Sequence, residues 1–262
     1  IKPPSLRSPV TCVSTLKRSL PDVSPIDMLV YGTENGRVYM LDTQAFQNLH
    51  CCQLPAPPVF IACHGAYDVD FRVFVSTRDG EVFSIKRDSN KTRLTRPIIS
   101  CRSHIVAIIK FGKTLAIACA DNSLTYYSHK GRRINQVLFE EPIIGLESFH
   151  YAPKQYTAVI VALQKEFRIY NEVALLDQMR VEHPLKWIKF GQFGREEAAL
   201  ILGTQRGGLM VKLFRRVARL EEHIDVSPPA LSYNFKLNIP KRSRLFIEQT
   251  SRERNNPRAM HQ

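Results

Sequence analysis

The sequence lacks the features that mark several common classes of protein. It has no run of about 18 apolar residues and no basic segment followed by an apolar leader, so we expect a cytosolic chain without a membrane span or a secretory signal. It also has no G-x-S-x-G elbow and no H-E-x-x-H pair. Since no other constellation of catalytic side chains stands out, we predict a protein that is not an enzyme.

Cysteine is present but does not have the spacing of a metal site. The six cysteines include no C-x-x-C pair. Two neighbouring groups of His and Cys, at residues 50–52 and 63–64, have no second pair at the short spacing that zinc sites use. We therefore predict reduced thiols that pack as small apolar groups, with no metal site and no cofactor.

Acidic residues are too few to balance the basic ones. Lys and Arg number 37 against 24 Asp and Glu, which gives a formal net charge of +13. Such an excess favours an acidic protein surface, anionic lipid or nucleic acid as partner. The basic residues are spread through the chain, with local clusters only at 215–216, 241–244 and 252–254. This dispersal favours a solvated or partner-facing surface and predicts that nucleic acid is not a partner.

What the sequence does contain is a repeat. An apolar run, a short turn and a second apolar run recur five times, and the first apolar residue after each turn recurs in steps of 44, 42, 43 and 42 residues. These anchor residues are Val38, Val82, Leu124, Phe167 and Leu209. Turn sequences such as Glu-Asn-Gly and Arg-Asp-Gly favour β-hairpins. A period of roughly 40 to 45 residues that carries strands predicts the blades of a β-propeller.

Each repeat has room for one strand before the hairpin and one after it, as a four-stranded, WD40-like blade requires. The strands before the hairpins are predicted at 11–16, 59–63, 104–111, 143–149 and 185–190, and those after them at 46–54, 94–100, 134–139 and 175–181. The fold class predicted from the sequence is therefore all-β, with about five blades present.

Five blades' worth of sequence suggests an incomplete ring, because every blade must pack against two neighbours. We expect residues 1–9 to be a connector, 10–249 to form about five blades, and 250–262 to be a polar linker. Because the first visible blade has no obvious predecessor, the sequence predicts part of a longer propeller that lacks blades on its N-terminal side.

The fifth repeat contains the most distinctive stretch, GTQRGGLMVK at 203–212. Adjacent glycines permit a turn at positive φ. In the strand that follows, side chains alternate between two faces. We predict that Met210, Lys212 and Phe214 form an outward row suited to a protein interface. Packing between blades explains the first row, Leu209, Val211 and Leu213, equally well, and both interpretations stay open.

Phe214-Arg215-Arg216 also resembles the Phe-Arg-Arg-Gly signature of phosphoinositide-binding propellers, whose two arginines bind lipid phosphates. Val217 stands where that signature has glycine. Direct phosphoinositide binding by a basic propeller face is therefore the alternative hypothesis, and a solvated strand end is the simpler interpretation.

At these residues the chain closely resembles the Bardet-Biedl syndrome 1 family. The segments that carry the resemblance keep the family's order and are spread over essentially the whole chain: LVYGTENGRVYMLD (29–42), NEVALLDQMRV (171–181), FGQFGREEAALILGTQRGGLMVKLFRR (190–216) and KLNIPKRSRLFIEQTSRER (236–254). The resemblance implies a seven-bladed propeller of which this chain has a part. It also implies a non-enzymatic subunit of the BBSome, a coat-like complex that carries membrane proteins into and out of cilia.

The resemblance further implies partners and a site. The expected partners are the other BBSome subunits, ciliary membrane-protein cargo and an Arf-like small GTPase in its GTP form, with peripheral membrane association at the cilium and basal body. In the family the GTPase docks on the first and last blades, and the last blade maps onto the fifth repeat here. The residues expected to bind the GTPase are Arg206, Gly207, Gly208, Met210, Val211, Lys212, Arg215 and Arg216. The resemblance implies that the family's first two blades and its helical insertion would precede the part represented here, and that its adaptin-ear-like C-terminal domain would follow it.

Overall fold

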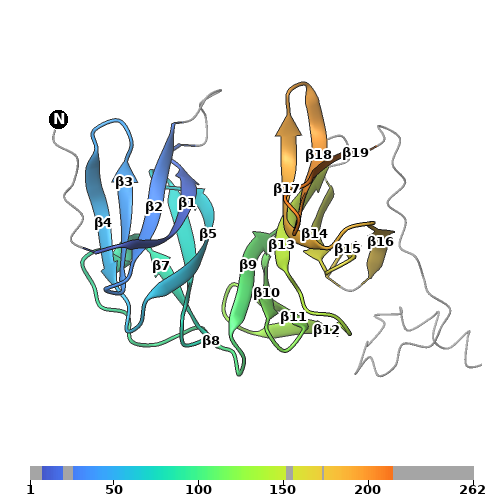
Figure 1. The fold of residues 1–262 in the computed structure, drawn as a ribbon. Helices are drawn as coiled ribbons and strands as arrows, with labels where there is room; N and C mark the ends of the chain where they lie inside the picture. Colours follow the sequence, from blue (N-terminus) through green and yellow to red (C-terminus); the bar gives the residue numbers. More distant parts are fainter. Residues whose placement is uncertain (1–7, 20–25, 152–155, 173, 215–262) are drawn as a thin grey trace, which may run out of the picture. The chain divides into compact units, whose positions relative to one another are not determined.

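The computed structural model of this chain describes residues 8–19, 26–151, 156–172 and 174–214. The regular secondary structure of this part consists of strands and one short 3-10 turn, and Figure 1 colours the strands from blue at β1 to orange at β19. The predicted connector at residues 1–9 is described only at Ser8 and Pro9, and the predicted linker at 250–262 lies outside the described residues, as does everything after 214. Among the described residues, no helix is long and apolar enough to cross a lipid bilayer.

The strands form five successive antiparallel meanders, one for each sequence repeat. We number these blades in chain order. The first blade contains β1 (Val10–Lys17), β2 (Asp27–Thr33), β3 (Arg37–Asp42) and β4 (Gln47–Gln53), and the second contains β5 (Pro58–Ala66), β6 (Asp70–Thr77), β7 (Glu81–Lys86), the short 3-10 turn η1 (Arg87–Ser89) and β8 (Ile99–Ser100).

The other three blades follow the same order. The third contains β9 (Ile105–Phe111), β10 (Thr114–Cys119), β11 (Ser123–Ser128) and β12 (Arg133–Leu138); the fourth contains β13 (Gly145–Tyr151), β14 (Tyr156–Ala162), β15 (Glu166–Tyr170) and β16 (Leu175–Arg180); and the fifth contains β17 (Leu185–Phe193), β18 (Glu196–Thr204) and β19 (Leu209–Leu213). The all-β, blade-by-blade fold predicted from the repeat is confirmed.

The central hairpin of most repeats turns at a residue with positive φ. The φ values are 79° at Gly36, 80° at Gly80, 61° at Asn122 and 85° at Gly207, and these residues occupy equivalent turns of four repeats. Glycine has no Cβ to clash in this region, and asparagine tolerates it better than most residues. The turn chemistry seen in the sequence therefore marks real hairpins.

The core lies between neighbouring blades. Four clusters of buried apolar side chains each combine residues of two consecutive blades, from the first and second to the fourth and fifth. Each inner blade therefore buries both of its faces, as the packing of propeller blades requires.

The strand predicted at 94–100 is the exception, because only Ile99 and Ser100 form β8. Pro97 has no N–H group to donate to a ladder. The residues before it bind the first blade instead: the Gln53 amide donates to the Thr92 carbonyl at 3.0 Å, and the Leu94 amide donates to the Gln53 carbonyl at 2.9 Å. This segment of the second blade thus covers the outer edge of β4.

Candidate functional site

The turn between β18 and β19 is held in one conformation by Thr204. Its hydroxyl accepts a hydrogen bond from the Gly208 amide at 2.8 Å and donates one to the Gly208 carbonyl at 3.2 Å. The Gly207 amide donates to the Thr204 carbonyl at 3.1 Å. Arg206 is exposed at the tip of this turn. The turn therefore presents a cation and two glycines from a fixed backbone.

The two faces of β19 are opposite to the predicted ones. Leu209, Val211 and Leu213 are 63%, 44% and 56% exposed. Met210 and Phe214 pack against the core between the fourth and fifth blades. The prediction that Met210, Lys212 and Phe214 form the outward row was wrong, because the fourth blade covers that face of β19.

Trp187 of β17 extends the exposed row. In the register of the fifth blade, Trp187 lies opposite Gly203, and Gly203 lies opposite Leu209. The indole is 44% exposed. Since Ile201 pairs with Val211, and Ala199 with Leu213, these residues continue the same face. We define the open face of the fifth blade by Trp187, Ile201, Leu209, Val211 and Leu213.

The structure separates the residues predicted to bind the GTPase. Arg206, Gly207, Gly208 and Val211 are exposed and lie in the turn or on the open face, and Lys212 is half-buried. Met210 faces the core. Arg215 and Arg216 lie outside the described residues, so the lipid-binding alternative, which depends on them, stays a prediction. Trp187 was missed, although it is the only tryptophan of the chain and falls in a predicted strand.

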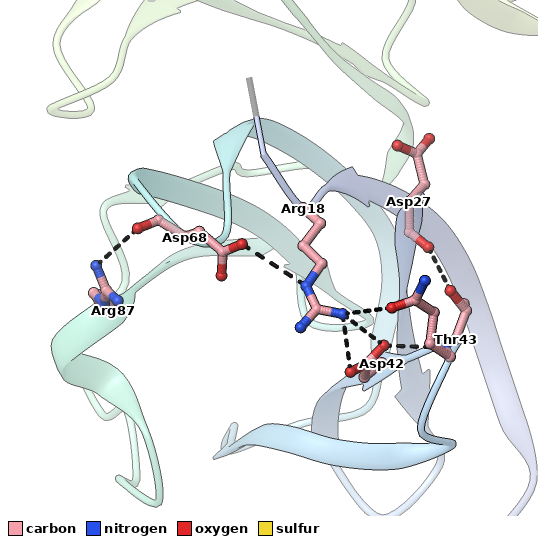
Figure 2. A network of polar contacts seen from close by, with 7 residues as sticks. Arg18, Asp27, Asp42, Thr43, Asp68 and Arg87 are labelled. Atoms are coloured by element: carbon pink, nitrogen blue, oxygen red, sulfur yellow. Dashed lines mark hydrogen bonds and ion pairs between the residues drawn. The ribbon is translucent and has the colours of Figure 1, made fainter. Parts of the chain in front are cut away.

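A polar network surrounds Arg18 (Figure 2). The Arg18 guanidinium lies 3.1 Å from the Asp42 carboxylate and 3.7 Å from that of Asp68. It also donates to the Gln44 amide oxygen at 3.2 Å. Asp42 ends β3, Gln44 lies in the β3–β4 connection, and Asp68 lies in the β5–β6 turn. Because carboxylates of two blades share one cation, this network is a clamp between the first and second blades.

Of the His and Cys groups noted in the sequence, His50 and Cys52 are buried, Cys51 and Cys63 are partly buried, and His64 is exposed. All six cysteines are free, and burial raises the pKa of the Cys63 thiol to about 12. The ring of His50 meets Phe71 edge-on with 5.7 Å between centroids. Among the described residues, no three His, Cys, Asp or Glu side chains gather as metal ligands would. The prediction of reduced, packed thiols fits this arrangement.

Comparison with known proteins gives one consistent family. A family model described as BBS1, ciliary BBSome complex subunit 1, matches residues 2–86. The human protein "BBSome complex member BBS1" is 34% identical over 254 residues, which are 96% of this chain and 42% of that protein. The mouse protein of the same name is 33% identical over 253 residues, with the same shares covered. The chain thus spans less than half the length of these curated relatives.

Solved structures agree with the sequence comparison. A crystal structure of BBS1N in complex with ARL6DN, soaked with lead, matches 84% of this chain and 69% of the solved chain with a TM-score of 0.76 and 26% identity. A second crystal of the same complex, soaked with mercury, matches with a TM-score of 0.76 and 27% identity. On sequence and fold together, the chain belongs to the BBS1 family, the family of ciliary BBSome complex subunit 1, and corresponds to part of its longer members.

Proposed function

We propose that this chain is the propeller part of a non-enzymatic BBSome subunit, and that its fifth blade forms part of a docking surface for an Arf-like small GTPase in the GTP-bound state. The proposal rests first on kinship, because the solved relatives are recorded in complex with ARL6DN. In this proposal residues 10–249 belong to the propeller, and residues 250–262 link it to a further domain.

The observation that carries the proposal is the open face of the fifth blade. Leu209 and Leu213 are more than half exposed, and Trp187 and Leu209 share Gly203 as their cross-strand partner. Apolar and aromatic side chains in contact with water gain free energy when a partner covers them. Trp and Arg are also enriched at the energetic centres of protein interfaces, and Arg206 stands at the adjoining turn.

Selectivity for the GTP state would arise on the side of the partner. The switch segments of small GTPases are ordered by the γ-phosphate and its magnesium ion, and they loosen on hydrolysis. A preformed surface such as the open face gains most from an ordered partner, because less conformational entropy is lost on binding. Docking of this kind would recruit the subunit, its BBSome partners and membrane-protein cargo to ciliary membranes.

The test is a comparison of nucleotide states. The chain, immobilised at one density, is exposed to the GTPase loaded with either a non-hydrolysable GTP analogue or GDP, and the two dissociation constants are measured. We expect binding at least tenfold tighter for the GTP form, about 1.4 kcal/mol. Equal affinity for the two forms would contradict state-selective docking, and no binding of either form would contradict docking by this part of the propeller.

A further inference from the structure

A second candidate site lies at the boundary between the second and third blades, far in sequence from the fifth repeat. His64 of β5, Arg72 of β6, Lys110 of β9 and His129, which follows β11, lie in contact there, and we call them the basic cluster. His64 and Arg72 are direct cross-strand partners. The ring centroids of His64 and His129 are 5.7 Å apart. Four basic side chains from three strands and one turn therefore share a small volume.

Hydrogen bonds and ring contacts join the members of the cluster. The Lys110 ammonium donates a hydrogen bond to Nδ1 of His64, and this nitrogen must therefore be unprotonated. The Arg72 guanidinium donates to the main-chain carbonyl of His129 at 3.3 Å. None of the four side chains takes part in an ion pair recorded among the described residues. The positive charge of the cluster is therefore not neutralised by a contacting carboxylate in this part of the chain.

The surroundings of the cluster disfavour the charged forms of its titratable members. Burial lowers the pKa of Lys110 to about 8. Burial, followed by the charge of Lys110, also lowers the pKa values of His64 and His129. Asp70 opposes this trend at His64, but as the smallest of the four contributions. A bound anion would offset the repulsion, because it favours the charged forms of Lys110 and His129 beside the permanent charge of Arg72.

Donors also remain free for such an anion. Nε2 of His129 is buried and has no hydrogen-bond partner within the described protein. The ring of Phe74 packs against this imidazole, with 5.4 Å between centroids. An ammonium has three N–H groups and a guanidinium has five, whereas the Lys110 and Arg72 contacts above use one each. The unused donors belong to residues that already touch one another.

We propose that the basic cluster binds the phosphate group of a phosphate monoester. A phosphate dianion has several oxygens that accept hydrogen bonds in different directions, and Lys, Arg and protonated His supply donors and charge together. A carboxylate has two oxygens and a single charge, so it would leave more of the cluster unpaired. The site is distinct from the open face of the fifth blade and does not depend on GTPase docking.

The experiment follows the histidine rings by nuclear magnetic resonance. The chain is titrated with inorganic phosphate, and with sodium chloride at matched ionic strength, at constant pH. We expect saturable shifts of the His64 and His129 ring signals with phosphate only. Lys110→Met should weaken phosphate binding about tenfold, as the loss of a charged hydrogen bond predicts. Lys113→Met, which changes an exposed lysine of the adjoining β9–β10 turn, should leave it unchanged.

A second variant tests the site in case Lys110→Met fails to fold. His64 is exposed, so His64→Gln should preserve the fold while it removes one titrating donor and weakens phosphate binding several-fold. Equal shifts in chloride and phosphate would overturn the proposal. So would equal phosphate affinity in Lys110→Met and Lys113→Met.

Vesicle sedimentation distinguishes a lipid headgroup from a soluble phosphate monoester as the ligand. Phosphatidylcholine vesicles with and without phosphatidylinositol 4-phosphate are added to the wild-type chain and to Lys110→Met. Sedimentation that needs both the phosphorylated lipid and Lys110 identifies a lipid headgroup. Saturable binding of free phosphate without such sedimentation identifies a soluble monoester. Either result supports the site, and failure of both overturns it.

Discussion

Gly203 makes room for the indole of Trp187. The two residues are cross-strand partners on β17 and β18. A Cβ atom on residue 203 would overlap the six- and five-membered rings of the tryptophan. The absence of a side chain at this one position therefore lets the only tryptophan of the chain lie against the sheet and take its place on the open face.

Replacement of this glycine should disturb both packing and the open face. Gly203→Ala forces the indole to move, and we expect the free energy of unfolding to fall by about 1 to 3 kcal/mol, as over-packed sites do. Chemical denaturation followed by tryptophan fluorescence measures the effect, and the emission maximum reports the displaced ring. Gly191→Ala in β17 is the control, because a Cβ there meets no atom within 4 Å. Similar losses in the two variants would refute the steric explanation.

Leu209 should contribute to docking without contributing to folding. It is 63% exposed, so Leu209→Gln should change the free energy of unfolding by no more than about 0.5 kcal/mol. If the open face contacts the GTPase, the same change should weaken binding of the GTP form by about 1 kcal/mol or more. Leu138→Gln is a matched control, because Leu138 is 72% exposed on the third blade. Unchanged affinity in Leu209→Gln would remove this residue from the interface.

The repeat predicts the architecture well because its signals are local. Alternating apolar residues and turns with Gly or Asn depend only on neighbours in the chain, and the hairpins at Gly36 and Gly80 formed where these signals lie. The orientation of β19 is not local. A period of two defines two faces but does not say which one meets the neighbouring blade. The fourth blade buries the face of β19 that carries Met210 and leaves the face of Leu209 exposed, so the face predicted from the sequence to point outward was the wrong one.

Two other features could not be predicted from one repeat at a time. The segment around Leu94 was expected to be a strand of its own blade, yet it pairs with Gln53 of the previous one. The basic cluster joins His64 and Lys110, which are separated by 46 residues and belong to different repeats. Contacts of this kind are set by how one repeat docks on the next, and no pattern within a repeat encodes them.

The Arg18 clamp should contribute more to the free energy of unfolding than an exposed ion pair does. The side chain of Asp42 is only 8% exposed, and Arg18→Met would leave this carboxylate without its cation in a place with little water. We expect a loss of about 1 to 3 kcal/mol in the free energy of unfolding, measured by urea denaturation. The control is Arg78→Met, whose pair with Glu34 is 60% and 42% exposed and should contribute less than about 1 kcal/mol. Equal effects would show that the clamp is only a surface contact.

Stability should fall in mild acid, in part because of His50. Burial lowers its pKa below the ordinary value of 6.5, and its Nε2 has no hydrogen-bond partner in the described protein. The unfolded chain therefore takes up a proton at a higher pH than the folded chain does, so the free energy of unfolding decreases as the pH drops below about 6.5.

His50→Leu should make the free energy of unfolding less dependent on pH. Thermal unfolding between about pH 7.5 and 5, a range that includes the ordinary pKa of histidine, would measure the difference. His183→Gln, which alters an exposed histidine in the link between the fourth and fifth blades, is the comparison. An unchanged slope in His50→Leu would assign the acid sensitivity to other groups.

The outer edge of β4 helps to hold the first and second blades together during local unfolding. Lys17 of β1 pairs with Ala66 of β5, and Gln53 of β4 pairs with Arg93, so main-chain hydrogen bonds tie the first two blades together along two separate strands. Side-chain packing alone joins most repeats of such arrays, and each can then fray independently. Here amide hydrogens of the first and second blades should exchange with solvent as one cooperative unit, because neither blade can open without breaking the main-chain hydrogen bonds that join it to the other.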